Sequence, residues 1–389
     1  MKRRLVIIDE TAKIGGAEIN LSRLASGLQR LGWEVEVILP ETGPLVDMLA
    51  GRGLACNVVP GGPFYSVSIY LGWKTKLPNP FAWLATTWNG IRWGYRLKKH
   101  LQEAQPTIVM TVSLLAHLIG GTAARRCGLP VVAHIQDIVA PESGFGLYRW
   151  ILNTWAKRIP DRIVCVSPIV AEQFGAAHKP VILWNSVDTS SFSTHIEMAD
   201  DAPILTIGSV GRLTPWKGHH IAIEAAQALR DQELPFRWFI VGDASLGDKR
   251  YAQKLYAAVR CSGLTDQVHF LGWKDDMPAF YRSLDLLVHL PTEAEPFGLV
   301  LAEAMACGIP VVATQGGGLD PIIPQGGGIL VPPGDVDSVV ETIIRLWQEP
   351  QDRRRRALLA RESAVKYFSA ENSLQQWIDL FTALSEPSM

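Results

Sequence analysis

The chain has 389 residues, of which 48% are hydrophobic and 19% are charged. This length exceeds one typical core, so we expect two domains of roughly 180 residues each. The formal net charge of −1 gives no basis for general nucleic-acid binding. The five cysteines are scattered and form no CxxC pair. This pattern argues against a zinc site or a disulfide framework and favours a reducing cytosol.

The N-terminus is basic and then apolar, but its apolar run ends at Asp9. We therefore interpret it as a first strand and not as a signal peptide. Because no run of about 18 uninterrupted apolar residues is found, we expect no membrane span. The prediction is a cytoplasmic protein.

Short apolar runs alternate with helical patterns, which is typical of parallel α/β architecture. The first strand, LVIID, precedes a predicted helix over 17–31, with leucines at helical spacing and Gly32 beyond its end. Further strands are predicted at EVEVIL, TIVMTVS, VVAHIQ, RIVCVS and VILWN. The polar, turn-forming stretch 188–203 is predicted to link two domains.

The second half repeats this scheme. Strands are predicted at ILTIGSVG, FRWFIVGD, VHFLG, DLLVHL, PVVAT and GILV, with helices over 218–230, 249–262, 297–307 and 335–348. A last helix, at about 370–385, has apolar residues at helical spacing. The arginine run 353–356 is predicted to be a solvated helix face. Doubly wound domains bind ligands at the carboxyl ends of their strands.

The stretch EPFGLVLAEAMACGIPVVAT is the most informative in the chain. Glu295 precedes a predicted helix, and Glu303 lies two turns into that helix. Free N–H groups and the positive end of the helix dipole can hold a diphosphate there. Glu303 can accept hydrogen bonds from sugar hydroxyls, and Glu295 can bind a second sugar. The arrangement predicts a nucleotide-sugar site.

Two other loops also follow predicted strands. Gly15 and Gly16 allow a backbone to approach a phosphate or a sugar, although an ordinary turn explains them as well. The dinucleotide pattern GxGxxG is absent there. In GRLTPWKG, Arg212 and Lys217 are either phosphate-binding cations or solvated ones. Their position after a central strand, beside glycines, favours phosphate.

A histidine ends a strand in the first half. His134 can reach a ligand cleft, with Asp137 nearby, or can be a satisfied core residue. The pair Asp335 and Asp337 looks like a metal-binding DxD, but it follows PPG and precedes an apolar helix. Helix capping explains these acids, so no metal site is predicted.

The segment 64–100 is rich in tryptophan, other aromatics and cations. Amphipathic aromatics with lysines suit a membrane interface or a lipid-linked acceptor. Alternatively, a helix packs these aromatics into the N-terminal core. The sequence leaves both interpretations open.

Together these motifs resemble the retaining GT-B glycosyltransferases of the group 1 family, family 4. The resemblance covers nearly the whole chain and is strongest over about 204–335. It rests on the EPFG–E motif at 295–303, on GR…KG at 211–218 and on GGAE at 15–18. WNSVD, at 184–188, has Ser186 where the family has glycine. His134 corresponds to the family's cleft histidine, with the usual adjacent acid displaced to Asp137.

The resemblance implies a fold of two doubly wound Rossmann-like domains that face a cleft. Residues 1–190 would form the acceptor-binding domain and 203–368 the nucleotide-sugar-binding domain. The final segment, 369–389, would be a helix that returns to the N-terminal domain.

The resemblance also implies residue roles. Arg212 and Lys217 would neutralise the donor diphosphate, Glu303 would bind the ribose hydroxyls, and Glu295 would bind the donor sugar. His134, Arg212, Lys217 and Glu295 are the candidate catalytic residues. The candidate donor-binding residues are Gly15, Gly16, Gly211, Arg212, Lys217, Gly242, Asp243, Trp273, Glu295, Phe297, Gly298, Leu299 and Glu303.

The expected activity is metal-independent, cofactor-free transfer of a hexose, with retention, from a UDP- or GDP-sugar. The acceptor would be a glycan, a lipid-linked molecule or a small molecule. For a lipid-linked acceptor, we expect peripheral contact with the inner face of a membrane through 64–100. Two rival functions remain: a nucleotide-sugar epimerase or hydrolase, which needs no acceptor, and a non-catalytic sugar-binding protein.

Overall fold

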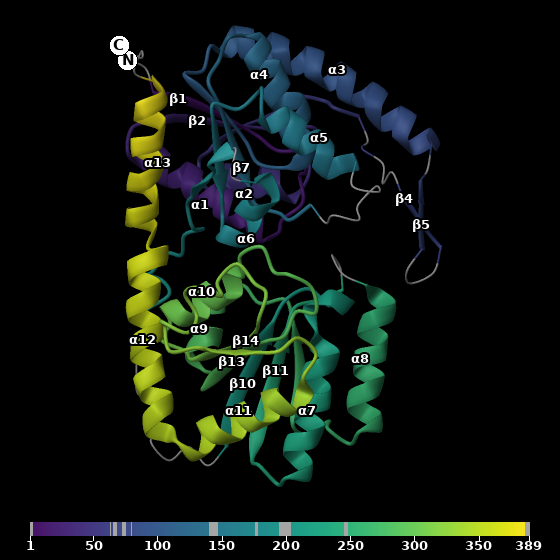
Figure 1. Cartoon of the computed structure of the whole chain (residues 1–389), viewed down its shortest axis with the longest axis vertical. Helices are drawn as coiled ribbons and strands as arrows, with labels where there is room; N and C mark the ends of the chain where they lie inside the picture. The colour runs from purple at the N-terminus through teal and green to yellow at the C-terminus, as the bar shows by residue number, and fades with distance from the viewer. Residues whose placement is uncertain are drawn as a thin grey trace. The chain divides into compact units, whose positions relative to one another are not determined.

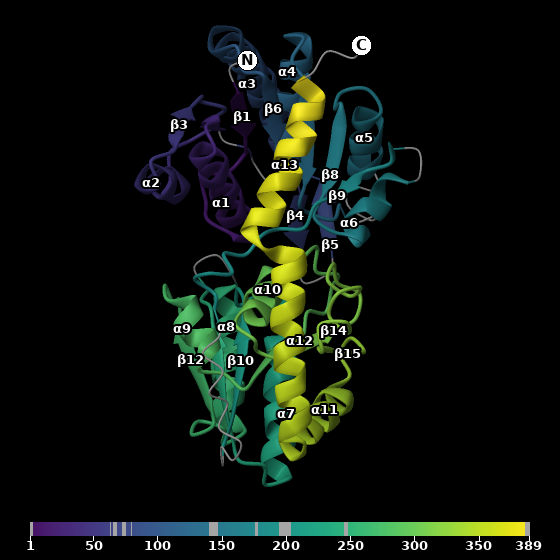
Figure 2. The ribbon, with the colours of Figure 1, turned by 90° about the vertical axis from the view of Figure 1, so that its left-hand side faces the viewer.

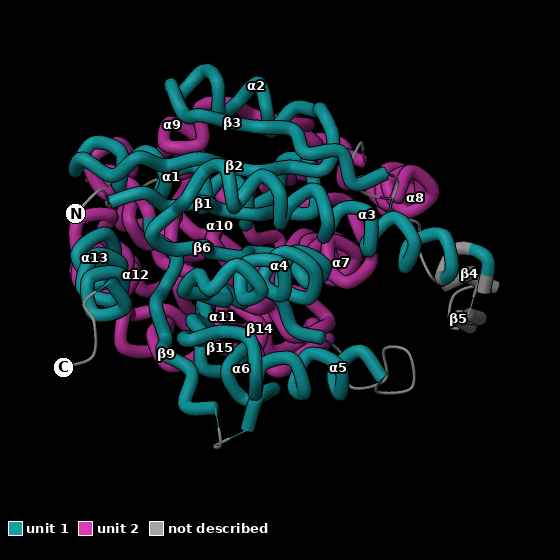
Figure 3. Tube along the Cα trace, turned by 90° about the horizontal axis from the view of Figure 1, so that it is seen from above, with its two compact units in different colours: residues 1–186, 373–389 teal, residues 187–372 magenta. Residues whose placement is uncertain are grey.

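The computed structural model describes residues 3–62, 64, 68–71, 75–78, 80–139, 147–175, 178–193, 204–244 and 248–385. The chain divides into two compact units. Unit 1 comprises Met1–Ser186 and Ser373–Met389, and unit 2 comprises Val187–Asn372 (Figure 3). Residues 194–203 of the predicted linker lie outside the described part of the chain.

Unit 1 is built on a seven-stranded sheet with the order β3-β2-β1-β6-β7-β8-β9, in which all described pairs are parallel. The predicted strands all form, whereas the sequence did not predict β3, the helix α2 (Pro44–Gly51) and the helices that follow β6, β7 and β8. The strands are β1 (Arg4–Ile8), β2 (Glu34–Leu39), β3 (Ala55–Val58), β6 (Ile108–Thr111), β7 (Val131–Ile135), β8 (Arg162–Cys165) and β9 (Val181–Ile182).

Alternate residues of β1 enter two different cores of unit 1, because successive side chains of a strand point to opposite faces. Leu5 and Ile7 pack with α1 (Gly16–Arg30), α2 and α13 (Ala370–Ser385). Val6 and Ile8 pack on the other face. That face is covered by α3 (Pro80–Ala104), the short π-helix η1 (Ala116–Gly121) and α4 (Thr122–Arg126). Helix α5 (Leu147–Ala156) also belongs to unit 1 (Figure 1).

The last helix of the chain completes the first of these cores. Trp377 and Phe381 of α13 are buried, and the Phe381 ring lies 5.4 Å from that of Trp33. Leu374 packs against Gly27 of α1, where a Cβ would come within 2.6 Å of its side chain. Figure 2 shows α13 lying over the sheet of unit 1. The expected helix therefore forms, and it packs on the N-terminal sheet.

Helix α3, in the aromatic segment 64–100, buries some of its large side chains in the core and exposes others. Trp93 and Leu97 of α3 are fully buried in the core, but Phe81, Trp88 and Tyr95 are 62–82% exposed. The helix is preceded by an antiparallel pair, β4 (Ser68–Leu71) and β5 (Thr75–Pro78). Trp73 and Lys74 lie outside the described residues.

Unit 2 has a six-stranded parallel sheet with the order β12-β11-β10-β13-β14-β15. Every predicted strand and helix of this half forms. The strands are β10 (Leu205–Val210), β11 (Phe236–Val241), β12 (Val268–Gly272), β13 (Leu286–His289), β14 (Val311–Thr314) and β15 (Ile329–Val331). This completes two doubly wound parallel α/β units, which confirms the predicted fold class.

Helices cover both faces of the unit 2 sheet. One core is formed with α7 (His219–Asp231), α8 (Lys249–Cys261) and α11 (Val336–Gln348). The helix α10 (Leu299–Ala306) contacts β13 and β14 and packs against α9 (Met277–Arg282) and α12 (Pro350–Phe368). The sequence did not predict α9. It also gave the wrong environment for Arg353, which is buried in α12 and donates to the Leu346 carbonyl at 3.0 Å.

We predict that Phe381→Ala destabilises unit 1, because its ring is fully buried between two tryptophans. The loss should be about 3–5 kcal/mol of unfolding free energy, measured by chemical denaturation. The control is Gln376→Ala at an exposed position of the same helix. Equal unfolding midpoints for the two variants would show that α13 contributes little to the core.

Candidate functional site

The central strand of unit 2 places the site. β10 lies between β11 and β13, so the chain leaves β10 and β13 toward opposite sides. In open α/β sheets a crevice forms at such a point, at the carboxyl ends of the strands. The loop 211–218 follows β10, and the loop 290–298 follows β13. A narrow pocket, without room for a water molecule, lies here and is lined by Ser209, Val210, Lys217, Gly218, His219, Ala222, Val288, His289 and Leu290.

Glycines let these loops approach one another. Gly218 has φ +70, and a Cβ there would lie 1.6 Å from the Leu290 carbonyl oxygen. Gly242, after β11, has φ +133, and a Cβ there would lie 2.0 Å from the oxygen of Gly211. No side chain fits at either position, and left-handed φ values favour glycine. The loops after β10, β11 and β13 are therefore held together by backbone contact.

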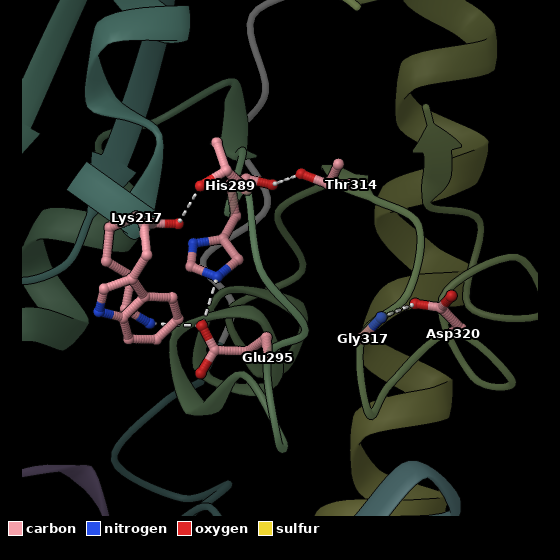
Figure 4. A network of polar contacts seen from close by, with 8 residues as sticks. Lys217, His289, Glu295, Thr314, Gly317 and Asp320 are labelled. Atoms are coloured by element: carbon pink, nitrogen blue, oxygen red, sulfur yellow. Dashed lines mark hydrogen bonds and ion pairs between the residues drawn. The ribbon is translucent and has the colours of Figure 1, made fainter. Parts of the chain in front are cut away.

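Lys217, Glu295 and His289 form a polar network that joins the two loops (Figure 4). Lys217 makes an ion pair with the Glu295 carboxylate, and its Nζ lies 4.1 Å from the centre of the Trp216 ring. His289 Nε2 is 3.1 Å from the same carboxylate oxygen. The side chains of Lys217 and Glu295 are only 12% and 13% exposed.

Electrostatics fix the charges in this network. Burial would raise the pKa of Glu295, but the charge of Lys217 and the hydrogen bond from His289 lower it to about 2. Burial lowers the pKa of His289 despite the nearby carboxylate. Since a carboxylate can only accept, the neutral imidazole donates its Nε2–H to Glu295. The network is a charged pair oriented by a neutral histidine.

The loop that carries Glu295 is anchored from a third strand. Gly318 donates its N–H to the Glu295 carbonyl at 2.8 Å, and Asp320 accepts from the N–H groups of Gly316 and Gly317. Thr314, at the end of β14, donates to the His289 carbonyl at 3.4 Å. Figure 4 shows this support beside the network. The carboxylate is therefore positioned by backbone as well as by side chains.

Two helix N-termini lie at the same edge of the sheet. Gly218 is the N-cap of α7, and Gly298, with φ +91, is the N-cap of α10. Neither glycine has a side chain that could cap its helix, and at α7 the Tyr251 hydroxyl accepts from the His220 N–H at 3.1 Å. Helix N-termini present free N–H groups and a positive dipole end, which suit an anion. Phe297 is buried against Phe368 of α12, so the loop before α10 is fixed.

The remaining predicted donor residues lie on α10 and on the loops that follow β11 and β12. Glu303 is buried in α10 and accepts a hydrogen bond from Tyr281 at 3.2 Å. The Asp243 carbonyl accepts from Leu213, and Gly242 donates to Gly272 at 2.8 Å. Trp273, next along the chain, is 60% exposed. The structure thus gathers the loops that follow β10, β11, β12 and β13, with Arg212 exposed among them.

His289 was missed by the sequence analysis, although its signal was present. It is the one polar residue at the end of an apolar strand, six positions before Glu295. His219, the first residue of α7, was missed as well, and it lines the same pocket. Burial, followed by the neighbouring His289, lowers the pKa of His219 to about 4. Both imidazoles are neutral at pH 7.

The other predicted site residues, Gly15, Gly16 and His134, belong to unit 1. Gly15 and Gly16 begin α1, with Gly15 extended at φ −140. The His134 ring is buried, lies 4.9 Å from that of Trp377, and has a pKa lowered to about 3 by burial. Asp137 is exposed. A catalytic role for His134 stays a prediction.

Two further expectations concern loops and metals. Ser186 has no left-handed φ, so the WNSVD segment does not need the family's glycine, and its N–H donates to Asn20 at 3.1 Å. Asp335 caps α11 through Ser338, as predicted. In the part of the chain that the structure describes, no cluster of three histidine, cysteine or acidic residues fits a metal ion. No described helix is long and apolar enough to cross a membrane.

We predict that Glu295 stabilises the fold only while it is ionised. Its folded pKa lies below the unfolded value of 4.5, so its contribution is complete above pH 4.5 and is lost as pH falls toward about 2. Glu295→Gln should therefore cost about 3 kcal/mol at pH 7 and much less near pH 2.5, measured by unfolding across this range. The control is the exposed Glu293→Gln. A pH-independent difference between wild type and Glu295→Gln would contradict this account.

Two family models cover most of the chain. The model of glycosyl transferases group 1 matches residues 200–362, and that of glycosyltransferase family 4 matches residues 14–191. These ranges contain every predicted site residue.

Relatives and a solved structure agree with these models. UDP-Gal:alpha-D-GlcNAc-diphosphoundecaprenol alpha-1,3-galactosyltransferase of Escherichia coli is 26% identical, covering 87% of this chain and 89% of the relative. GDP-mannose-dependent alpha-mannosyltransferase of Mycobacterium tuberculosis is 28% identical over 93% and 92%. HepE of Anabaena, solved with UDP-glucose, is 25% identical, with a TM-score of 0.81 over 98% and 99%.

Another match is local. D-inositol 3-phosphate glycosyltransferase of Corynebacterium urealyticum is 33% identical over 46% of this chain, and the match spans 43% of that protein. The two family models, the named relatives and the geometry of the unit 2 site agree. The chain belongs to the group 1 glycosyltransferases of family 4.

Proposed function

We propose that this glycosyltransferase moves a hexose, with retention and without a metal ion, from a UDP-sugar to a glycan or lipid-linked acceptor. The observation that carries the proposal is the network of Lys217, His289 and Glu295 beside the glycine N-caps of α7 and α10. It combines an anion-binding edge with a fixed carboxylate, which are the two elements that a nucleotide-diphosphate sugar requires.

The positive groups stabilise the leaving diphosphate. Lys217, the exposed Arg212 and the N-terminus of α10 provide preorganised positive potential at one edge of the sheet. Such groups lower a barrier when they face charge that develops in the transition state. Three sources of positive potential can fill the role that a divalent cation has in other transferases, which is why we propose a metal-independent reaction.

Glu295 orients the donor sugar. Its carboxylate is held by Lys217 and His289, so it is ionised and fixed in direction. A carboxylate in two interactions is a poor nucleophile, which favours a displacement on one face of the sugar. In that step the bond from C1 to the diphosphate oxygen breaks and a bond from C1 to the acceptor oxygen forms. The acceptor proton passes to the departing phosphate oxygen.

The nucleoside lies along the neighbouring loops in this proposal. Glu303 accepts hydrogen bonds from the ribose hydroxyls, and the hydrogen bond from Tyr281 fixes the direction of its carboxylate. The exposed indole of Trp273 and the turn at Gly242 and Asp243 border the base. Their backbone links make this side of the site continuous with the loop that carries Arg212.

The base of the donor is assigned from the names of relatives. The names of the Escherichia coli relative and of the Anabaena complex contain UDP, whereas that of the mycobacterial relative contains GDP-mannose. We propose UDP and treat GDP as the alternative. An acceptor distinguishes transfer from hydrolysis or epimerisation, because those reactions proceed without one.

We predict that UDP raises the melting temperature of the protein more than GDP does, with or without magnesium. A ligand that binds only the folded state stabilises it in proportion to the logarithm of its concentration. The measurement is a thermal-shift titration with UDP, GDP, ADP and TDP, each with and without chelator. A larger shift with GDP would reverse the base assignment, and a shift that needs magnesium would contradict metal independence.

We predict that Arg212→Ala lowers kcat by about 10²–10³-fold, the loss typical of one group that stabilises transition-state charge. Lys217→Ala should lose at least as much, but it also leaves Glu295 without its ion-pair partner. Arg212 is exposed, so its variant separates catalysis from folding. Turnover is measured as nucleotide release with acceptor, and Arg237→Ala, at an exposed position of β11, is the matched control.

A near-normal rate for Arg212→Ala, with the fold intact, would refute its assigned role. The stereochemistry is tested on the same enzyme by following the anomeric configuration of the product by NMR. An inverted product would refute the same-face displacement while leaving the donor site unaffected.

A further inference from the structure

Helix α3 carries large apolar side chains on its exposed side. Phe81, Leu84, Trp88, Ile91 and Tyr95 are between 51% and 82% exposed. Their spacing of three and four residues alternates, so they form one continuous stripe along the helix. We call these five residues the α3 stripe.

The α3 stripe is not what holds the helix on the sheet. The opposite side of α3 supplies Trp93, Leu97 and Leu101, which are 0–1% exposed and pack in the unit 1 core. A surface helix needs one apolar face, and α3 has two. Soluble proteins rarely expose a large contiguous apolar patch unless it serves an interaction.

Cations flank the α3 stripe. At 100° per residue, Arg92 and Arg96 fall on one side of it, Lys98 on the other, and Lys99 in line with it. Arg92 and Lys99 are exposed. Over Pro80–Ala104 the sequence has four Lys or Arg residues and one acidic residue, Glu103. The surface is therefore apolar along its centre and positive at its margins.

A second helix of unit 1 extends the same side. On α5, Leu147 and Trp150 are 47% and 65% exposed. Trp155 of α5 packs on His117 of η1, and η1 also contacts α3. Figure 3 shows α3, α4 and α5 on one side of the unit 1 sheet. Exposed aromatic side chains thus occur on two helices that cover one face.

We propose that the α3 stripe docks unit 1 on the surface of an anionic lipid bilayer. A helix with an apolar face and basic margins lies in the plane of the interface, with its apolar side chains below the headgroups. The flanking cations meet negative headgroups, which is the charge complementarity that selects lipid over a neutral apolar partner. Tryptophan and tyrosine suit this depth because they are amphipathic.

This inference deepens the proposed function and rests on it in one respect. If the protein is a transferase with the proposed donor site, a bilayer-bound unit 1 makes a lipid-linked acceptor the preferred substrate class. Lipid binding itself does not depend on that chemistry. The two proposals can therefore fail separately.

The experiment is flotation of the full chain with vesicles of phosphatidylglycerol and phosphatidylcholine. Wild type should bind vesicles rich in phosphatidylglycerol, and high salt should weaken the binding because it screens the headgroup charge. Phe81→Gln, Trp88→Gln and Ile91→Gln together should lower the partition coefficient at least about tenfold. Arg92→Gln with Lys99→Gln should lower it about fivefold for each cation removed.

Matched controls keep the test specific. Leu358→Gln with Tyr256→Gln removes exposed apolar side chains of unit 2, and Arg250→Gln with Arg345→Gln removes two of its cations. Both controls should bind vesicles as wild type does. All variants should keep the melting temperature and the UDP-induced thermal shift of wild type.

Three outcomes would overturn the proposal. Wild type that ignores anionic vesicles would do so, as would a stripe variant that floats like wild type. A wild-type dimer in solution that the stripe variant converts to monomer would assign the α3 stripe to a second copy of the chain. If docking fails while UDP still raises the melting temperature, only the docking surface is refuted.

Discussion

The buried ion pair between Lys217 and Glu295 is the constraint on which the site depends. It joins the loop after β10 to the loop after β13, at the point where the chain leaves the central strands in opposite directions. Breaking a buried pair by removing one partner costs far more than an exposed pair contributes. The loops are therefore held in register by charge as well as by the contact of Gly218 with Leu290. His289 adds direction, because a neutral imidazole can donate to only one acceptor at a time through Nε2.

The same pair has a consequence for donor binding. The Glu295 carboxylate is the anion that Lys217 binds in this structure. Under the proposed function, a donor diphosphate shares Lys217 with Glu295, and Arg212 and the N-terminus of α10 compensate for the shared charge. A site with its cation already paired costs less to keep folded than one with a bare buried lysine. Under the proposed function, the pairing of Lys217 therefore stabilises the protein without donor and lowers its affinity for donor.

The sequence predicted unit 2 well because its site is made by backbone constraints that only certain residues satisfy. Gly218, Gly242 and Gly298 are each forced by a left-handed φ, and the acids and cations follow them at fixed spacing. The partner of a charge was harder to predict. Nothing local indicated that Arg353 would be buried, and the position of His289 at the end of an apolar strand marked it without naming its partner, because both contacts depend on elements that meet only in the folded chain. Strand and helix positions follow local pattern, whereas pairing follows tertiary contact.

In unit 1, by contrast, contacts between side chains decide where the residues in question lie. His134 obeys the same local rule as His289, since each ends an apolar strand, yet its ring packs under Trp377, a residue from the far end of the chain. The α3 helix likewise has two apolar faces, and periodicity alone does not say which one enters the core. Burial of Trp93 decides it, and Trp88 is left outside. The exposed side chains of α3 are free to vary without cost to the fold, because the opposite, buried face of the helix packs in the core. Specificity for the acceptor is expected to reside in such residues, and the donor site in the loops that backbone geometry fixes.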